Sequence, residues 1–420
     1  MTSLTLPRRT ILTKTNVRNA IILSPLLIFV GLFNRYIFVE TYLNYFASCV
    51  CLFLIFKNHY RLKRIMFINR VVISIFVFLS YTLIRIDYDF FLAEMNNDSS
   101  GFFDDISNLS TYLILFIFGT ILSFNKSNGS DLIWLAVSIY MIMYILRTLY
   151  SLDEVQAGAH LGAGTVIISL LPFVLLGLKN YEYKERYATI ILCIGILFMV
   201  LVGARTAALA LIVLVFVLNM WPYLIKNKFR FNLVLLTTMA AILFLYLVYI
   251  VYMTHDGEPL IAESSIGAFQ KSTDTRFVIW VHLLATIQDN IWWGVGSLKS
   301  TAEASPLAYL DFSMNRKNLA AHSLYFELIY RLGVVGLSLF LAIIFALWAC
   351  FWKGRNFWEI KVAASVLIAI LFLASSSVVI VFSAMELRWG FVWLFFGIAF
   401  GSSLPKISID SKRTRNNFKI

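Results

Sequence analysis

Long runs of apolar residues, each separated from the next by a short polar segment, make up most of this 420-residue chain. Each run is about 17–25 residues long, which is enough for a helix to cross the ~30 Å hydrocarbon core of a bilayer. The strands of a membrane barrel would instead be about ten residues long, with alternating polarity. The pattern therefore predicts an all-α integral membrane protein.

We expect about twelve transmembrane helices in a single polytopic membrane domain, residues 1–420. One long hydrophilic insertion, residues 253–330, forms a large loop between the ninth and tenth spans. Loops of this length are usually functional, so this loop is expected to carry part of the site. The spans are expected near residues 19–35, 37–56, 68–85, 109–124, 131–149, 161–178, 187–203, 205–222, 232–252, 331–352, 360–381 and 387–403.

The distribution of charge predicts how the chain is oriented. If the N-terminus is cytoplasmic, the cytoplasmic segments hold 24 of the 35 Lys and Arg, whereas 18 of the 23 Asp and Glu lie on the other side. Cytoplasmic enrichment in Lys and Arg sets the orientation of membrane proteins. Both termini are therefore expected in the cytoplasm. The net charge of +12 needs no nucleic-acid partner, because no soluble domain carries a basic patch.

Composition agrees with a membrane protein and points to no metal or cofactor. The chain is 60% hydrophobic and 14% charged, whereas soluble proteins carry about 25% charged residues. Walker, HExxH and GxSxG motifs do not occur. Four cysteines fall within apolar runs and lack metal-ligand spacing with histidines, so they are expected to be packing residues: Cys49, Cys51, Cys193 and Cys350.

Four basic residues cluster at the outer membrane face in this expected topology. Arg205 lies in a tight Gly-Ala-Arg-Thr turn, Arg276 and His322 lie in the large loop, and Arg388 begins the last span. An arginine fork fits phosphate oxygens, and histidine can act as a general base near neutral pH. Together they suit glycosyl transfer from a lipid pyrophosphate to a hydroxyl, with neither metal nor nucleotide.

These residues also have structural interpretations. Arg205 could snorkel to lipid headgroups, Arg276 could pair with a nearby acid, and His322 could be an ordinary interfacial histidine. Glu327 and Arg331 are four residues apart on an expected helix, so an i,i+4 ion pair explains them. Three tryptophans fit an aromatic belt at the membrane interface more readily than a sugar-stacking surface: Trp280, Trp292 and Trp293.

Three segments between roughly residues 200 and 340 resemble the O-antigen ligase and O-antigen polymerase superfamily. They are VGARTAALALIVLVF, TRFVIWVHLLATIQDNIWWGVG and AHSLYFELIYRLGVVGL. The first opens an apolar helix with Gly-x-Arg-Thr, and the second has an Arg, a Trp four residues later and a closing Gly-x-Gly. The third has a His, an acidic residue and a Gly-x-x-Gly helix start. The chain departs from the common pattern at Ser323, where many members have Asn, and at Asp289-Asn290, where a Pro often precedes the glycines.

The resemblance implies a GT-C-like glycosyltransferase of the bacterial inner membrane whose active site faces the periplasm. Its donor would be a glycan on undecaprenyl pyrophosphate, and its acceptor either the lipid A core or a second lipid-linked glycan. Arg205, Arg276 and Arg388 would bind the pyrophosphate. His322 would activate the acceptor hydroxyl or orient the donor.

Two functions within the superfamily stay open at this point. A ligase, the leading interpretation, joins finished O-antigen to the lipid A core, whereas a polymerase extends the chain by repeat units with the same donor chemistry. A flippase or other transporter would show a polar cavity at the membrane midplane and often inverted repeats, and neither is visible in the sequence. Charges near the middle of the spans, which ion-coupled transporters use, are nearly absent. A purely structural scaffold is the remaining alternative.

Overall fold

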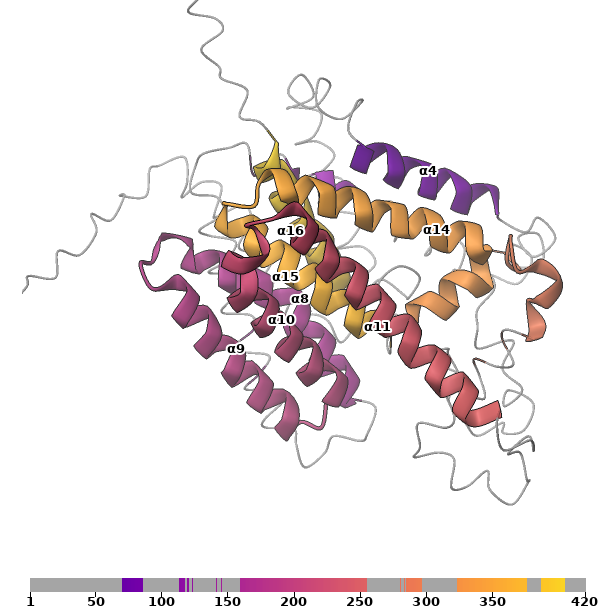
Figure 1. Cartoon of the computed structure of the whole chain (residues 1–420), viewed down its shortest axis with the longest axis horizontal. Coiled ribbons are helices and arrows are strands. Elements are labelled where there is room, and N and C mark those ends of the chain that lie inside the picture. Colours follow the sequence, from indigo (N-terminus) through magenta and orange to yellow (C-terminus); the bar gives the residue numbers. More distant parts are fainter. Residues whose placement is uncertain are drawn as a thin grey trace, which may run out of the picture.

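The computed structural model describes residues 70–85, 113–117, 119–120, 123, 141, 145, 159–254, 280, 283, 285–296, 323–375 and 387–404. Within this part of the chain every regular element is helical, as the sequence predicts, and no strand is found there. The long helices are α4 (Arg70–Ile84), α8 (Ala159–Gly177), α9 (Lys184–Leu201), α10 (Arg205–Leu224), α11 (Lys228–Thr254), α14 (Leu324–Lys353), α15 (Trp358–Ala374) and α16 (Leu387–Ser403) (Figure 1). Two short 3-10 helices, η1 (Leu178–Asn180) and η3 (Gln288–Asn290), accompany them.

These long helices coincide with eight of the expected spans, and the described residues of 109–124 and 131–149 are also helical. The first two expected spans, and most of the expected 253–330 loop, lie outside the described residues. By length and composition, α10 and α14 are apolar and long enough to cross a membrane. The total of twelve spans stays a prediction.

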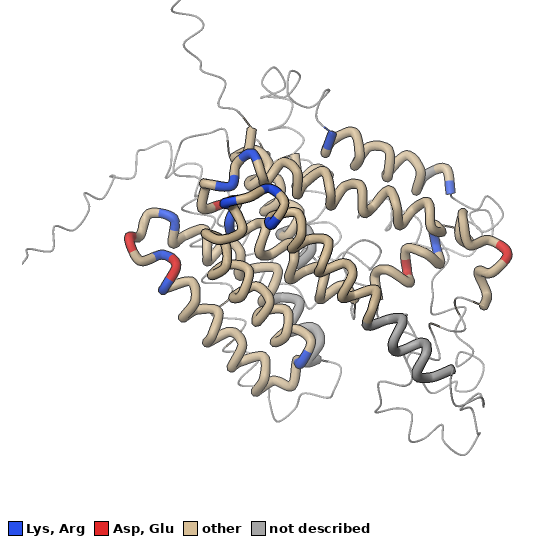
Figure 2. Tube along the Cα trace, viewed as in Figure 1, with Lys and Arg blue, Asp and Glu red and all other residues tan. Residues whose placement is uncertain are grey.

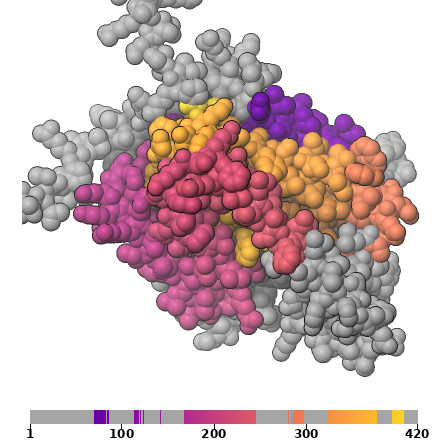
Figure 3. All heavy atoms as spheres, in the orientation of Figure 1, coloured from indigo at the N-terminus to yellow at the C-terminus, as the bar shows by residue number. Residues whose placement is uncertain are grey.

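Large apolar side chains lie exposed along the outer faces of the helices. On α9 they are Ile190, Ile194, Leu197 and Leu201, whose spacing of three or four residues forms one stripe. Comparable residues lie on α4, α10 and α11. In Figure 3 the magenta-to-red helices lie next to one another on the face that is seen. Soluble monomers rarely expose apolar surface of this extent. These faces fit contact with lipid hydrocarbon.

Helix α15 forms the centre of the bundle. Nearly all of its residues are buried, so it has no exposed face among its neighbours α8, α10, α11, α14 and α16. A helix that is apolar all round is expected to be buried on all sides. Its sequence follows this rule, because between Lys361 and Ala374 it contains apolar residues and one serine, Ser365, whose hydroxyl donates to the Lys361 carbonyl.

Helix α16 approaches the 113–123 segment closely enough to leave no room for side chains at the crossing. A Cβ on Gly397 would lie 2.0 Å from the Phe116 carbonyl oxygen, and a Cβ on Gly119 would lie 2.2 Å from that of Leu394. Small residues commonly permit such close packing of transmembrane helices. The two glycines therefore permit the short distance between these two helices.

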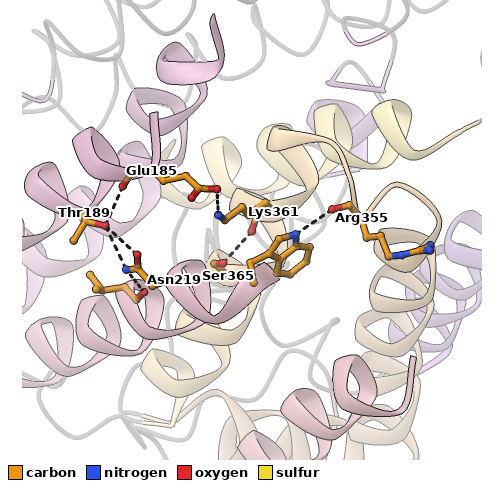
Figure 4. Close-up of polar contacts among 8 residues, drawn as sticks. Glu185, Thr189, Asn219, Arg355, Lys361 and Ser365 are labelled. Atoms are coloured by element: carbon orange, nitrogen blue, oxygen red, sulfur yellow. Dashed lines mark hydrogen bonds and ion pairs between the residues drawn. The ribbon is translucent and has the colours of Figure 1, made fainter. Parts of the chain in front are cut away.

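Two ion pairs join helices at the end of the bundle that the charge distribution assigns to the cytoplasm. Lys361 at the start of α15 pairs with Glu185 at the start of α9, with 2.5 Å between Nζ and Oε1 (Figure 4). Lys179 pairs with Glu359 beside it. Figure 2 shows Lys and Arg positions gathered at this end, while the middles of the helices carry uncharged residues. Loops expected on the same side of the membrane thus lie together.

The Glu185–Lys361 pair leads to a stability prediction. The Lys361 side chain is 6% exposed, whereas that of Glu185 is 55% exposed. We expect Glu185→Ala to lower the unfolding free energy by about 1–2 kcal/mol, because it leaves the buried ammonium without its acceptor. Lys361→Met should cost less, since a buried apolar chain of similar length needs no partner. Thermal unfolding in detergent measures both, and a Glu185→Ala variant as stable as wild type would contradict the prediction.

Candidate functional site

Arg205 begins α10 directly after a tight turn. Gly203 has a φ of +77°, a conformation that glycine adopts without a steric penalty, and the amide of Ala204 donates to the Met199 carbonyl at 2.9 Å. The N-cap residue of α10, Ala204, makes no side-chain cap bond, and the first turn of the helix contains no acid. Arg205 itself is exposed. A cation is disfavoured at a helix N-terminus, where anions such as phosphate bind readily. A phosphate bound here would therefore be stabilised both by the Arg205 guanidinium and by the N–H groups at the start of α10.

Helices α10 and α15 run antiparallel, which determines what lies near Arg205. The Trp221 indole N–H, at the other end of α10, donates to the carbonyl of Arg355 at 3.0 Å, just before α15 begins (Figure 4). Because the two helices pack along one another, Arg205 lies at the end where α15 finishes. The Tyr325 hydroxyl, in the first turn of α14, donates to the Leu371 carbonyl near that same end of α15 at 2.9 Å. The starts of α10 and α14 thus share one end of the bundle.

Helix α14 is broken at Gly333, whose φ of 67° and ψ of −172° are not helical. Its shorter first segment turns sharply away from the rest (Figure 1). Backbone groups at the break bond to the turn at 291–296. The amides of Val295 and Gly296 donate to the carbonyls of Tyr330 and Arg331 at 2.8 and 3.1 Å, and the amides of Val334 and Val335 donate to those of Ile291 and Trp292 at 2.9 and 3.2 Å.

Only glycine fits at the two contact points of this junction. A Cβ on Gly333 would lie 2.2 Å from the carbonyl oxygen of Trp292, and a Cβ on Gly294 would lie 2.6 Å from that of Arg331. Gly294 and Gly296 both have positive φ, as the expected turn requires. The Gly-x-x-Gly pattern was expected to start the helix. Instead α14 begins at Leu324, and Gly333 divides it.

The predicted Glu327–Arg331 ion pair is confirmed. Arg331 Nε lies 2.6 Å from Glu327 Oε1, and both side chains are buried. Pairing offsets part of the cost of burying the two charges, which allows α14 to begin seven residues before the expected span. Both side chains are therefore part of the packed interior of this region.

A stacked aromatic pair joins the second and third sequence motifs. The rings of Trp280 and Phe326 are 4.8 Å apart and nearly parallel at 14°, within a small apolar cluster that also contains Leu283, Ile287 and Tyr330. Trp280 is buried, so its expected place in an interfacial belt is wrong, because the ring packs against α14. Trp292 and Trp293 are exposed, as a belt requires.

Of the four predicted site residues, Arg205 is the one whose surroundings the structure describes. Arg388 lies in the first turn of α16, and its side chain lies outside the described part, as do Arg276 and His322. Ser323, the residue after His322, is the buried N-cap of α14. Among the described residues no group of His, Cys, Asp or Glu could hold a metal ion.

Arg85, at the end of α4, belongs to this region but was not among the predicted site residues. Its Nε and Nη2 donate to the carbonyls of Trp293 and Gly294 at 3.1 and 3.0 Å. The expected topology puts it among the basic residues on the outer side of the membrane. That position was the available signal, but it does not reveal which backbone groups the side chain meets.

Residues 188–341 match a family model described as O-antigen ligase. The match covers just over a third of the chain, from α9 into the second segment of α14. It confirms the resemblance to the O-antigen ligase superfamily, whose members are membrane glycosyltransferase-like enzymes. A comparison with curated proteins finds no match to this chain.

Proposed function

Residues 188–341 match the O-antigen ligase family, and we propose that the protein is a ligase. It transfers a glycan from undecaprenyl pyrophosphate to a hydroxyl of the lipid A core. The reaction takes place at the periplasmic face of the inner membrane, and both termini lie in the cytoplasm. The observation that carries this proposal is the exposed Arg205 on the uncapped start of α10, inside the matched segment.

The diphosphate of the donor binds where α10 begins. Arg205 contributes a planar fork that pairs with two phosphate oxygens, and the N–H groups of the first helical turn contribute the helix dipole. Arg276 and Arg388 complete the pocket. As the glycosyl–phosphate bond breaks, negative charge grows on the leaving undecaprenyl pyrophosphate, and fixed cations stabilise this charge more than that of the ground state.

His322 acts as the general base. Its imidazole removes the proton of the acceptor hydroxyl, the oxygen bonds to the anomeric carbon, and undecaprenyl pyrophosphate departs with the electrons of the broken bond. The Trp280–Phe326 stack joins the two segments that carry Arg276 and His322. Arg276 and His322 each precede one member of this stack by four residues, and four residues span at most about 14 Å.

A deletion strain tests the ligase against a polymerase. Loss of a ligase should leave the lipid A core unsubstituted while lipid-linked polymer accumulates, as seen by gel analysis of lipopolysaccharide. Complementation with the wild-type gene should restore the ladder of glycan-substituted lipopolysaccharide bands on the gel. A gene that encodes His322→Ala should not restore it. Core capped with a single repeat unit would contradict the ligase and identify a polymerase.

Purified protein offers a direct check of the acceptor. Lipid-linked donor mixed with rough lipopolysaccharide should give elongated lipopolysaccharide and free undecaprenyl pyrophosphate in equal amounts. The same donor without lipopolysaccharide should give neither product. Chain growth on a second donor molecule would contradict the proposed acceptor.

A further inference from the structure

The break in α14 is closed by groups from two distant parts of the chain. The turn at 291–296 supplies the four backbone hydrogen bonds described above, and the Tyr81 hydroxyl of α4 donates to the Leu332 carbonyl at 2.9 Å. Backbone groups freed at a helix break are costly unless they find partners, above all at membrane depth. The junction thus locks three elements into one arrangement: α4, the turn and α14.

Arg85 holds the outer side of this junction. Its guanidinium donates to two consecutive carbonyls of the turn, those of Trp293 and Gly294. The Tyr81 ring, one turn earlier on α4, lies 6.5 Å from the Trp293 ring. A guanidinium can reach two acceptors with fixed geometry, whereas an ammonium acts as a point charge. The side chain therefore fixes the orientation of the turn as well as its distance from α4.

The turn is continuous with the segment that carries Arg276, and the first part of α14 follows His322 directly. Between them lies the apolar cluster around Trp280 and Phe326. A shift of the turn against the break would therefore displace one side of the proposed site relative to the other. Misplacement by about 1 Å can cost roughly 100-fold in rate.

We infer that Arg85 is a positioning residue for transfer: through its two bonds to the turn, it keeps the Arg276 segment in register with the start of α14. It does not contact the substrate. This inference rests on the proposed function, because it assigns Arg85 a part in setting the geometry of that site.

The test measures transfer kinetics of purified Arg85→Gln and Arg85→Lys in proteoliposomes, with thermal unfolding measured alongside. We expect Arg85→Gln to lower kcat about tenfold or more while KM for the donor changes little, and Arg85→Lys to fall between it and wild type. The matched control is Arg230→Gln at the cytoplasmic end, where Arg230 lies over the Tyr223 ring. The control should retain wild-type kcat.

Three outcomes would overturn the inference. The first is a wild-type kcat for Arg85→Gln, and the second is the same kcat for Arg85→Gln and Arg85→Lys. The third is a fall in kcat that is fully explained by a smaller fraction of folded protein. If Arg85→Gln does not fold, Tyr81→Phe removes the neighbouring bond to Leu332 and should lower kcat in the same way. Arg205→Ala is assayed in parallel. Normal transfer by Arg205→Ala would refute the proposed function. Loss of transfer in Arg205→Ala together with normal transfer by Arg85→Gln would refute this inference alone.

Discussion

Arg205→Ala is expected to reduce glycan transfer by about 100- to 1,000-fold, the effect typical of removing one fixed donor to a developing negative charge. Arg205 is exposed at the uncapped start of α10, so its removal leaves no unpaired buried group, and the protein should accumulate normally. Arg205→Lys should also be damaging, because an ammonium lacks the two-pronged geometry that matches phosphate. Initial rates with purified protein and lipid-linked donor measure both variants.

Arg186 provides the matched control. It is an exposed arginine in the first turn of α9, at the opposite end of the bundle, and lies over the Tyr183 ring. Arg186→Ala should transfer glycan at the wild-type rate. Equal rates for Arg205→Ala and Arg186→Ala would show that Arg205 is an interfacial anchor with no part in binding the donor.

Gly333→Ala is expected to have the largest effect on folding. The φ and ψ at Gly333 lie in a region that essentially only glycine occupies, at a cost of about 1–3 kcal/mol for another residue. The added Cβ would also meet the Trp292 carbonyl at 2.2 Å, so the turn would have to leave the junction. We expect a clear fall in melting temperature in detergent, together with loss of transfer.

Gly195→Ala is the control for this substitution. Gly195 lies within α9, where an added Cβ would sit 3.4 Å from the Leu211 side chain, an ordinary contact. Alanine is favoured over glycine inside helices by about 1 kcal/mol, so this variant should be as stable as wild type or more so. A Gly333→Ala protein with the melting temperature of Gly195→Ala would contradict the role of the break.

The helices were predictable because each crossing needs its own apolar run. The boundary between α9 and α10 shows this, since Gly203 and Arg205 interrupt otherwise continuous hydrophobic sequence and the structure turns there. The expected span began at Arg331, seven residues after the start of α14, because hydrophobicity alone excludes the segment that contains Glu327. Their mutual ion pair, which the i,i+4 spacing did predict, allows the helix to contain both.

The junction could not be predicted because it depends on contacts between distant segments. A glycine in a helical pattern is compatible with a helix, and the break at Gly333 exists because the 291–296 turn supplies hydrogen bonds there. Trp280 was assigned to the interface on composition, but its place depends on Phe326, 46 residues further along the chain. Arg85 donates to backbone carbonyls. Because every residue has a backbone carbonyl, the sequence does not indicate which residues Arg85 contacts.

The central claim is that arginine side chains and one histidine enclose a lipid diphosphate at the periplasmic end of the bundle. A structure determined by electron cryomicroscopy with an undecaprenyl-pyrophosphate-linked glycan bound tests it most directly. The predicted result is a diphosphate held by the guanidinium groups of Arg205 and Arg276, with the His322 imidazole facing the sugar. A diphosphate bound elsewhere, or these three side chains in separate pockets, would contradict the claim.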